Sequence, residues 1–167
     1  MSAKITPVVE LHRQIKSGIR DFAGISVRGG NLRGARLRGL DLSGADLRGA
    51  DLAHASLYQL NLFRADLKFA NLSCAHLHRA NLQESDLRLA TLSETRLWQA
   101  DLGAANLRGA NLIRAVLTGA DLGYTDLRGA TLLEADLRFA NLVGSLFDRT
   151  TLFSSGFQPE QAGMHEV

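Results

Sequence analysis

The chain has 167 residues and a net charge of +2 at pH 7, with 19 Lys and Arg against 17 Asp and Glu. This near balance excludes a strongly basic or acidic protein, and the length fits a single domain. Cys74 is the only cysteine, so no internal disulfide can form. The N-terminus lacks the apolar core of a secretion signal, and no apolar run approaches a membrane span. These features together predict a cytoplasmic protein that does not enter the membrane.

The first segment, residues 1–19, is expected to form a helical cap. Thr6 suits the N-cap of a helix over residues 7–17, and Gly18 suits its end. Proline is favoured in the first turn, where Pro7 stands. One face of this helix would be apolar, carrying Val8, Leu11 and Ile15. We expect that face to cover the beginning of the segment that follows.

From Phe22 to Phe157, every fifth residue is apolar and most are Leu, which gives 28 positions in one register. The residue two places earlier is usually Ala, and the intervening residue is often Asp or Asn, as in the stretch 45–49, ADLRG. A period of five fits neither the 3.6 of a helix nor the 2.0 of a flat strand. It fits a chain that turns a corner every five residues, with the Leu and the small residue pointing inward. Such strict internal repetition takes precedence over local signals.

This pattern resembles the pentapeptide-repeat family, whose consensus is A(D/N)LXX, over residues 20–157. The resemblance implies a right-handed four-sided β-helix with four pentapeptides in each coil. The residues after the central Leu support four sides independently, because basic residues recur there every 20 positions: Arg28, Arg48, Lys68, Arg88, Arg108 and Arg128. We therefore expect an all-β solenoid, a right-handed quadrilateral β-helix of about seven coils with a short N-terminal capping helix.

The four faces of such a coil are named here by their central residues. Face one contains Leu42, face two Leu47, face three Leu52 and face four Leu57, each repeated at intervals of 20. Asp and Asn precede the central residue throughout face one, where they favour a ladder of turn-stabilising hydrogen bonds. On face two, carboxylates alternate with the basic residues: Asp46, Asp66, Asp86 and Asp126. This predicts an ion-pair lattice and argues against direct nucleic-acid binding, because carboxylates oppose phosphate.

Face four departs from the pattern, because Asp and Asn no longer precede its central Leu. The only Trp, one of the two Tyr, two His and several Arg gather there: Arg36, Arg38, Tyr58, His76, His78, Arg79, Arg96 and Trp98. Trp, Tyr and Arg are the residue types that anchor protein interfaces. Arg96 and Trp98 flank Leu97 and are expected to stack. We interpret this face as a partner-binding site. The alternative is a variable surface on which large residues fall together by chance.

The C-terminal end has an aromatic last coil followed by a short polar tail, residues 158–167. An open β-end rich in Phe is prone to association. We therefore predict an end-to-end homodimer through Leu146, Phe147, Leu152, Phe153 and Phe157. The apolar residues Ile113, Leu133 and Phe153, 20 apart on face three, would extend this contact. The tail is too short to cover a coil well, although the alternative is that it folds back as a cap.

The sequence carries no recognisable catalytic chemistry. It has no G-x-S-x-G, no phosphate-binding loop and no H-E-x-x-H. Cys74, His76 and His78 are the only group resembling a metal motif, and no fourth ligand is evident. An interior filled by Leu and Ala leaves no substrate pocket. We therefore expect no catalytic residues, no cofactor and no metal.

Three functions are compatible with these observations. The first is a non-catalytic scaffold or regulator that docks a protein partner on face four. The second is suggested by the family resemblance: some pentapeptide-repeat dimers resemble duplex DNA in shape and charge and act on DNA gyrase or topoisomerase. Against it, face two and face four of this chain carry Arg. The third is a purely structural solenoid without a dedicated partner.

Overall fold

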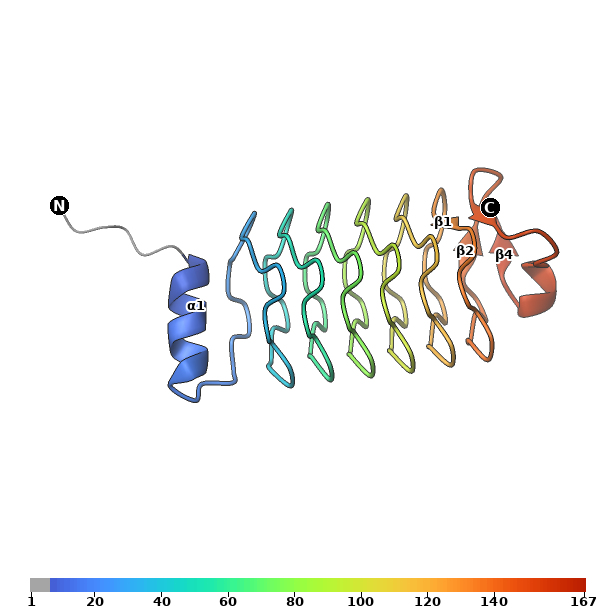
Figure 1. Cartoon of the computed structure of the whole chain (residues 1–167). Coiled ribbons are helices and arrows are strands. Elements are labelled where there is room, and N and C mark those ends of the chain that lie inside the picture. The colour runs from blue at the N-terminus through green and yellow to red at the C-terminus, as the bar shows by residue number, and fades with distance from the viewer. Residues whose placement is uncertain (1–6) are drawn as a thin grey trace.

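The computed structural model describes residues 7–167. It begins with helix α1, Pro7–Lys16, one residue shorter than predicted, and Thr6 lies outside the described residues. The helix lies against one end of the molecule (Figure 1), where Leu11 is fully buried and Val8 and Ile15 pack on the core. Among residues 7–167, no helix is long and apolar enough to cross a membrane.

The body of the protein is a solenoid of stacked coils (Figure 1). Isolated parallel bridges join residues 20 apart, from Asp21↔Asp41 at one end to Asp126↔Leu146 at the other. In each bridge the main chain hydrogen-bonds to the next coil, as when Leu47 N donates to Asp66 O at 2.8 Å. Twenty residues are four pentapeptides, so each coil has four sides, as the spacing of basic residues predicts.

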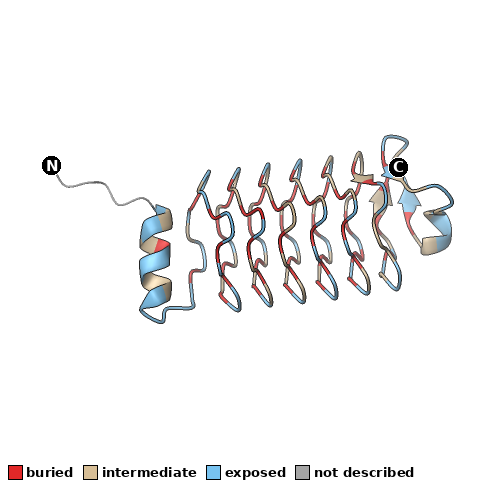
Figure 2. Cartoon of the chain, in the orientation of Figure 1, coloured by how far each residue is buried: buried red, intermediate tan, exposed pale blue. Residues whose placement is uncertain are grey.

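The interior is a continuous stack of leucine and small side chains. Leu47 and Ala45 are fully buried, and buried residues recur along every coil (Figure 2). Hydroxyl-bearing residues replace Ala at four buried positions: Ser85, Thr95, Thr125 and Ser145. Each hydroxyl donates to a main-chain carbonyl at 2.6–2.8 Å, so the polar group is satisfied inside the core.

A turn closes each five-residue segment. Ala45 N donates to Leu42 O at 3.1 Å, and the residue between them, Gly44, has a φ of 64°. Glycine occupies this left-handed position in the first coils, but most later turns place other residues there, including Ala104 with a φ of 56°. A side chain at positive φ costs about 1–2 kcal/mol. The later coils therefore carry local backbone strain that the first coils avoid.

The repeat register shifts by one residue after Phe147. Strand β1, Thr131–Leu132, pairs in parallel with β3, Leu152–Phe153, and Thr131 lies opposite Leu152, 21 residues later. The prediction that Leu152 is a central inward residue is wrong: it is 49% exposed, and Phe153 takes the place above Leu132. Thr151 fills the small inward position, where its hydroxyl donates to Leu127 O. Phe153 therefore does not belong to the outward stripe predicted on face three.

The C-terminal segment folds back onto the last coil. After the 3-10 helix η1, Glu160–Ala162, strand β4, His165–Glu166, pairs in parallel with β2, Leu146–Phe147. Met164 is buried beside it. The expectation that this tail is too short to cover a coil well is thus wrong for face two. Two parallel backbone pairings and the buried side chain of Met164 hold the tail against the last coil. The folded-back alternative describes this segment.

The strain in the turns gives a test with two neighbouring alanines. Ala104→Gly removes a side chain from an exposed left-handed position and should stabilise the fold by about 0.5–1 kcal/mol, the relief exceeding the added chain entropy. Ala105→Gly removes a fully buried methyl group and should destabilise it by about 1–2 kcal/mol. Thermal unfolding followed by circular dichroism compares the two. A lower midpoint for Ala104→Gly would contradict the strain argument.

Candidate functional site

The structure brings the eight predicted residues of face four together on four consecutive coils. Parallel bridges run Arg36↔Ser56, Ser56↔His76 and His76↔Arg96. The residues after the central Leu form a second column beside this one, made of Arg38, Tyr58, His78 and Trp98. The arginines and Trp98 are exposed, while Tyr58 and both histidines are half-buried. The face is therefore a flat ladder of large polar and aromatic side chains.

Two arginines lie over aromatic rings. The guanidinium carbon of Arg38 is 4.6 Å from the ring centroid of Tyr58, and that of Arg79 is 5.2 Å from the ring of Trp98. Arg79 Nε also donates to Gln99 Oε1 at 3.0 Å. The expected stacking partner of Trp98 is thus wrong, because Arg79 rather than Arg96 covers the ring. Arg79 is placed there by its main-chain N–H, which donates to Trp98 O in the next coil.

His78 lies at the centre of this ladder. Its ring centroid is 5.9 Å from that of His76 and 6.3 Å from that of Trp98, which meets it edge-on at 76°. Its Nδ1 is buried and has no hydrogen-bond partner among the described residues. Burial lowers the pKa of His78, and the positive charges of His76 and Arg96 lower it further. An imidazole whose Nδ1 has no hydrogen-bond partner in the described chain therefore lies between the rings of His76 and Trp98.

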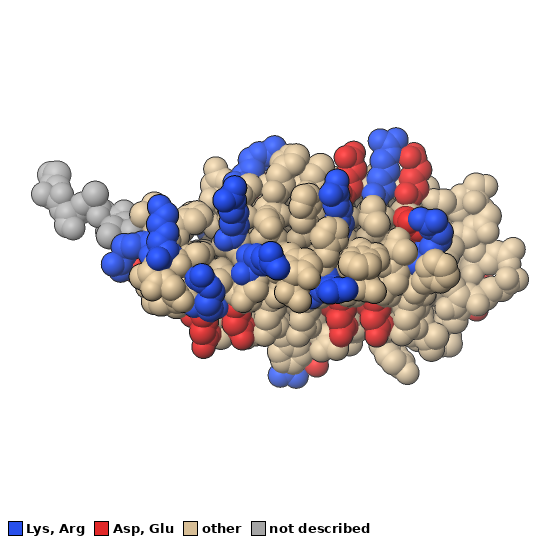
Figure 3. All heavy atoms as spheres, turned by 60° about the horizontal axis from the view of Figure 1, so that its bottom comes forward, with Lys and Arg blue, Asp and Glu red and all other residues tan. Residues whose placement is uncertain are grey.

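Four arginines of face four make no ion pair in the described part of the chain. Within residues 7–167, none of the ion pairs closer than 4.0 Å includes Arg36, Arg38, Arg79 or Arg96. The first carboxylate on this face is Asp136, which pairs with Arg138 at 2.7 Å. Figure 3 shows both arrangements on one side of the molecule, with some cations beside Asp and Glu and others apart from them.

Face two carries the predicted ion-pair lattice. Arg48 lies 2.6 Å from Asp46 in its own repeat and 3.6 Å from Asp66 in the next coil. Lys68 bridges two coils, at 3.3 Å from Asp66 and 3.2 Å from Asp86. Hydrogen bonds from Arg48 lower the pKa of Asp46 to about 2. Four cations of this face, at positions 48, 68, 88 and 128, are therefore paired with carboxylates of the chain itself.

Face one carries the predicted hydrogen-bond ladder. Asp41 Oδ1 accepts the main-chain N–H of Ser43 at 2.8 Å and the side-chain amide of Asn61 at 3.1 Å. Asn81 donates to Asn61 in the same way. These side chains fix the turns and join neighbouring coils, so their first role is structural.

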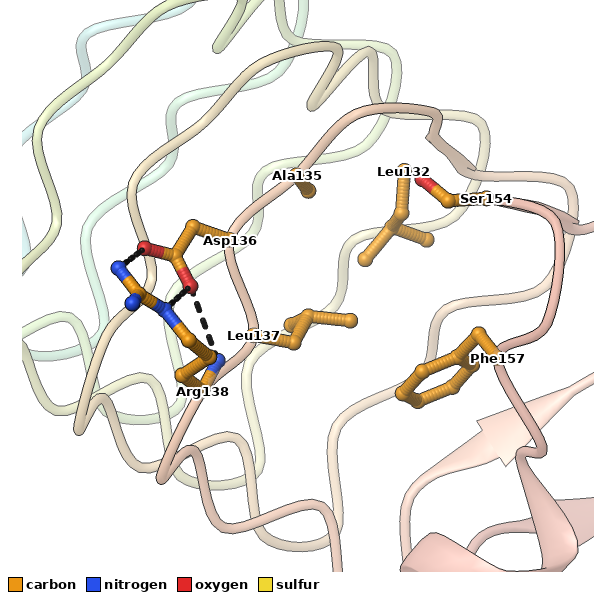
Figure 4. A pocket seen from close by; sticks show the side chains of 7 residues that line it. All are labelled: Leu132, Ala135, Asp136, Leu137, Arg138, Ser154 and Phe157. Atoms are coloured by element: carbon orange, nitrogen blue, oxygen red, sulfur yellow. Dashed lines mark hydrogen bonds and ion pairs between the residues drawn. The ribbon is translucent and has the colours of Figure 1, made fainter.

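A shallow apolar hollow opens at the C-terminal end over face four. It has a volume of about 320 Å³ and is lined by Leu132, Ala135, Asp136, Leu137, Arg138, Ser154 and Phe157. Figure 4 shows Leu137 and Phe157 facing each other across it. Phe157 stacks on Phe153, with ring centroids 4.9 Å apart, and Phe153 meets Phe147 edge-on. Among the described residues, the N–H groups of Leu137 and Phe139 donate no hydrogen bond.

The proposed homodimer residues are divided between this end and the interior. Phe147 is buried and pairs with Glu166, whereas Leu152 points outward and Phe157 borders the hollow. Leu146 is half-buried opposite His165. Only part of the predicted set therefore remains available to a second molecule.

No metal site is formed in the described part of the chain. Nowhere in residues 7–167 do three or more His, Cys, Asp or Glu side chains converge in a way that could hold an ion. The thiol of Cys74 points toward Glu94, 3.8 Å from its Oε2, rather than toward the two histidines.

Comparison with known proteins identifies the repeats. A family model described as pentapeptide repeats matches eight copies within residues 31–68, 61–99 and 99–132. The chain belongs to the pentapeptide-repeat family. A comparison with curated protein sequences found no match.

Solved structures of other pentapeptide-repeat proteins are similar to this one. HetL, involved in heterocyst differentiation regulation in the cyanobacterium Nostoc sp. strain PCC 7120, is 33% identical, with 83% of this chain and 80% of HetL aligned at a TM-score of 0.49. Rfr23 from the cyanobacterium Cyanothece 51142 is 30% identical, with 87% and 98% aligned at a TM-score of 0.50. QnrB1, a plasmid-mediated fluoroquinolone resistance protein, is 21% identical over 80% of this chain and 72% of its own, at 0.53. The likeness to QnrB1 shows the shared fold alone.

Sequence reasoning located face four in this pentapeptide-repeat protein but missed the C-terminal hollow. The hollow depends on the shifted register after Phe147, which brings Ser154 and Phe157 beside Leu137. A signal was present: the A(D/N)LXX pattern is lost after Asn141-Leu142, and the adjacent pair Leu152-Phe153 fits either register.

The lattice of face two predicts an acid-dependent loss of stability. The pKa of Asp46 is about 2 in the fold and about 3.9 in an unfolded chain. Its ionised form therefore stabilises the fold above about pH 4, and that contribution disappears as the pH falls toward about 2. Asp46→Ala should lower the free energy of unfolding by more at neutral pH than at about pH 2, and the difference should be at most about 1 kcal/mol.

Asn106→Ala is the matched control, because Asn106 accepts the same turn hydrogen bond from Arg108 without a charge. Its cost should not change with pH. Denaturant unfolding of both variants at the two pH values measures the difference. Equal pH dependence of the two variants would contradict the ion-pair argument.

Proposed function

We propose that this protein is a non-catalytic interaction scaffold that binds a protein partner on face four. Pentapeptide-repeat proteins are generally structural or interaction proteins rather than enzymes. The core of this one is a closed stack of Leu and Ala, so its chemistry resides on its outer faces.

The clustering on face four carries this proposal. Three faces have side chains occupied with one another, in the turn ladder of face one and the ion pairs of faces two and three. Face four instead presents an exposed Trp98, a half-buried Tyr58 and arginines without acidic partners. Large aromatic and guanidinium groups supply most of the binding energy at protein interfaces.

A regulatory role is the form of this function that one relative suggests. HetL, at 33% identity, is involved in regulating heterocyst differentiation. A rigid rod without a catalytic centre can regulate only by binding, through masking a partner or bridging two of them. We extend that reasoning to this chain through its own face four, whichever partner it binds.

We do not favour action on gyrase, the alternative suggested by the family resemblance. Mimicry of DNA requires a continuous acidic surface. The carboxylates of face one are interrupted by Asn61 and Asn81, and those of face two are neutralised by Arg and Lys. The resistance named for QnrB1 belongs to that protein.

We also propose the finer features of the fold and setting. The coil is right-handed, as parallel crossover connections almost always are. About seven coils follow from 20 residues per coil, and α1 closes the first of them by burying Leu11. The single cysteine supports a cytoplasmic location, because the chain cannot form the internal disulfides that are typical of oxidising compartments.

Trp98 and Arg96 test the partner site. The double variant Arg96→Ala/Trp98→Ala should lose a protein that the wild type retains from a lysate of the native host, because two central contacts are removed. The matched control is Arg114→Ala/Leu133→Ala, which removes an exposed cation and an exposed apolar side chain from face three. If both variants retain the captured protein, face four is not the partner-binding site. If the wild type retains nothing, a purely structural solenoid becomes the better description.

We further propose that a second copy of the chain docks at the C-terminal end. The specific support is the hollow between Leu137 and Phe157, together with two free main-chain N–H groups at its edge. Unpaired strand edges with apolar neighbours favour pairing with another chain. This site overlaps the predicted dimer interface at Phe157.

The oligomeric state in solution tests whether a second copy docks at the C-terminal end. Light scattering coupled to size-exclusion chromatography should give a dimer for the wild type and a monomer for Phe157→Lys, because a charge would enter the apolar hollow. Phe69→Lys is the control, since Phe69 is 62% exposed and lies far from the end. A wild type that stays monomeric at all concentrations up to about millimolar, where even weak association shows, would end the proposal.

A further inference from the structure

The charges of face four stand apart from those of the other faces. On faces one, two and three, Arg64 lies 2.7 Å from Glu84, Arg48 2.6 Å from Asp46, and Arg114 2.8 Å from Glu134. The face-two arginines Arg28 and Arg108 make no such contact, yet their charges reach Asp46 and Asp126 and lower the pKa of each. Only on face four, within the described chain, do four arginines share a surface without an ion pair to a carboxylate: Arg36, Arg38, Arg79 and Arg96.

Two of these arginines are already oriented. Arg38 lies over Tyr58, and Arg79 lies over Trp98 and donates to Gln99. Stacking on a ring leaves the N–H groups at the guanidinium edge free to donate, and it reduces the side-chain entropy lost on binding. A carboxylate accepts two parallel N–H bonds from such a group.

The spacing fits a short extended peptide. Arg36 and Arg96 lie three coils apart, about 14 Å at the spacing of a parallel ladder. An extended chain advances about 3.3 Å per residue and places alternate side chains on one side. A segment of about five residues with acidic alternate positions would therefore span the arginines.

Stacked nucleic-acid bases fit this ladder less well. Neighbouring side chains repeat with the coils at about 4.8 Å, and main-chain hydrogen bonds such as Arg79 N to Trp98 O fix that spacing. Inserting a base about 3.4 Å thick between two rings would need about 6.8 Å. One face of each ring, that of Tyr58 and that of Trp98, is also occupied by an arginine.

We infer that face four binds an acidic protein segment, with its carboxylates pairing with Arg36, Arg38, Arg79 and Arg96. This inference rests on the proposed function and specifies the chemistry of its partner. His76 and His78 add positive charge only when protonated, and the arginines alone make the face cationic at neutral pH.

Trp98 gives a direct measurement, because it is the only Trp in the chain and lies inside the site. An octa-glutamate peptide titrated into the full-length protein should change the Trp98 fluorescence to saturation, while octa-glutamine should not. Raising the salt from about 50 mM to about 200 mM should weaken the binding several-fold, as for exposed charge pairs. No response to octa-glutamate up to about millimolar concentrations, the limit of weak specific binding, overturns the inference.

The matched variants separate a site from general charge. Arg79→Gln/Arg96→Gln should weaken octa-glutamate binding about tenfold, whereas Arg28→Gln/Arg108→Gln, with the same net charge, should change it less than about twofold. Both pairs are exposed, and Gln already stands at the position of Arg79 in neighbouring coils, at Gln59 and Gln99. An equal loss in the two variants overturns the inference.

Two further results separate this inference from the proposed function. Tighter binding of an oligothymidylate of the same length than of octa-glutamate would assign face four to nucleic acid and overturn the inference. A protein captured from lysate through Trp98, together with no octa-glutamate binding, would keep the proposed function and reject the acidic partner. Saturable octa-glutamate binding that needs Arg79 and Arg96 supports the inference whether or not a lysate yields a partner.

Discussion

Each inward leucine of this protein is buried by the leucines of the coils before and after it, and the rest of the structure depends on that stack. Leu67 is fully buried because Leu47 and Leu87 lie above and below it, and Ala65 leaves room beside them. Burial of one such side chain contributes about 1.5–3 kcal/mol. No coil can achieve this alone, so stability rises with the number of coils, and each end needs a cover.

Because this inward stack holds the coils together, the outward side chains are less constrained by the fold. Two outward positions per pentapeptide flank each central leucine, and main-chain hydrogen bonds hold them at one spacing from coil to coil. Faces one and two use these positions to join neighbouring coils, through Asn61 to Asp41 and Lys68 to Asp86. On face four, rings and the Arg79–Gln99 hydrogen bond join neighbouring coils, and four arginines of the described chain make no ion pair there. A cluster of large side chains without internal ion pairs favours contact with another molecule.

The two ends of the solenoid differ in how their exposed coil edges are covered. At the N-terminal end, α1 places Leu11 against the first coil. At the C-terminal end, β4 covers Leu146 and Phe147, while the face-four edge at Leu137 keeps free N–H groups beside an apolar hollow. One end thus has a helix packed against it, and at the other only part of the backbone edge is paired. This asymmetry is the reason for our proposal that a second copy docks at the C-terminal end.

The amino-acid sequence by itself determined the period, the inward residues and the faces, because a five-residue repeat allows only one way to bury Leu and Ala together. It therefore located Trp98, His78 and the arginines on one face, and it predicted the Asp46–Arg48 pairs. Only the tertiary structure decided that Arg79 rather than Arg96 covers Trp98, since that contact joins side chains from different coils. It alone decided that Leu152 points outward and Phe153 inward, because both are apolar and an inserted residue is stabilised by the Thr151 hydrogen bonds rather than by the repeat.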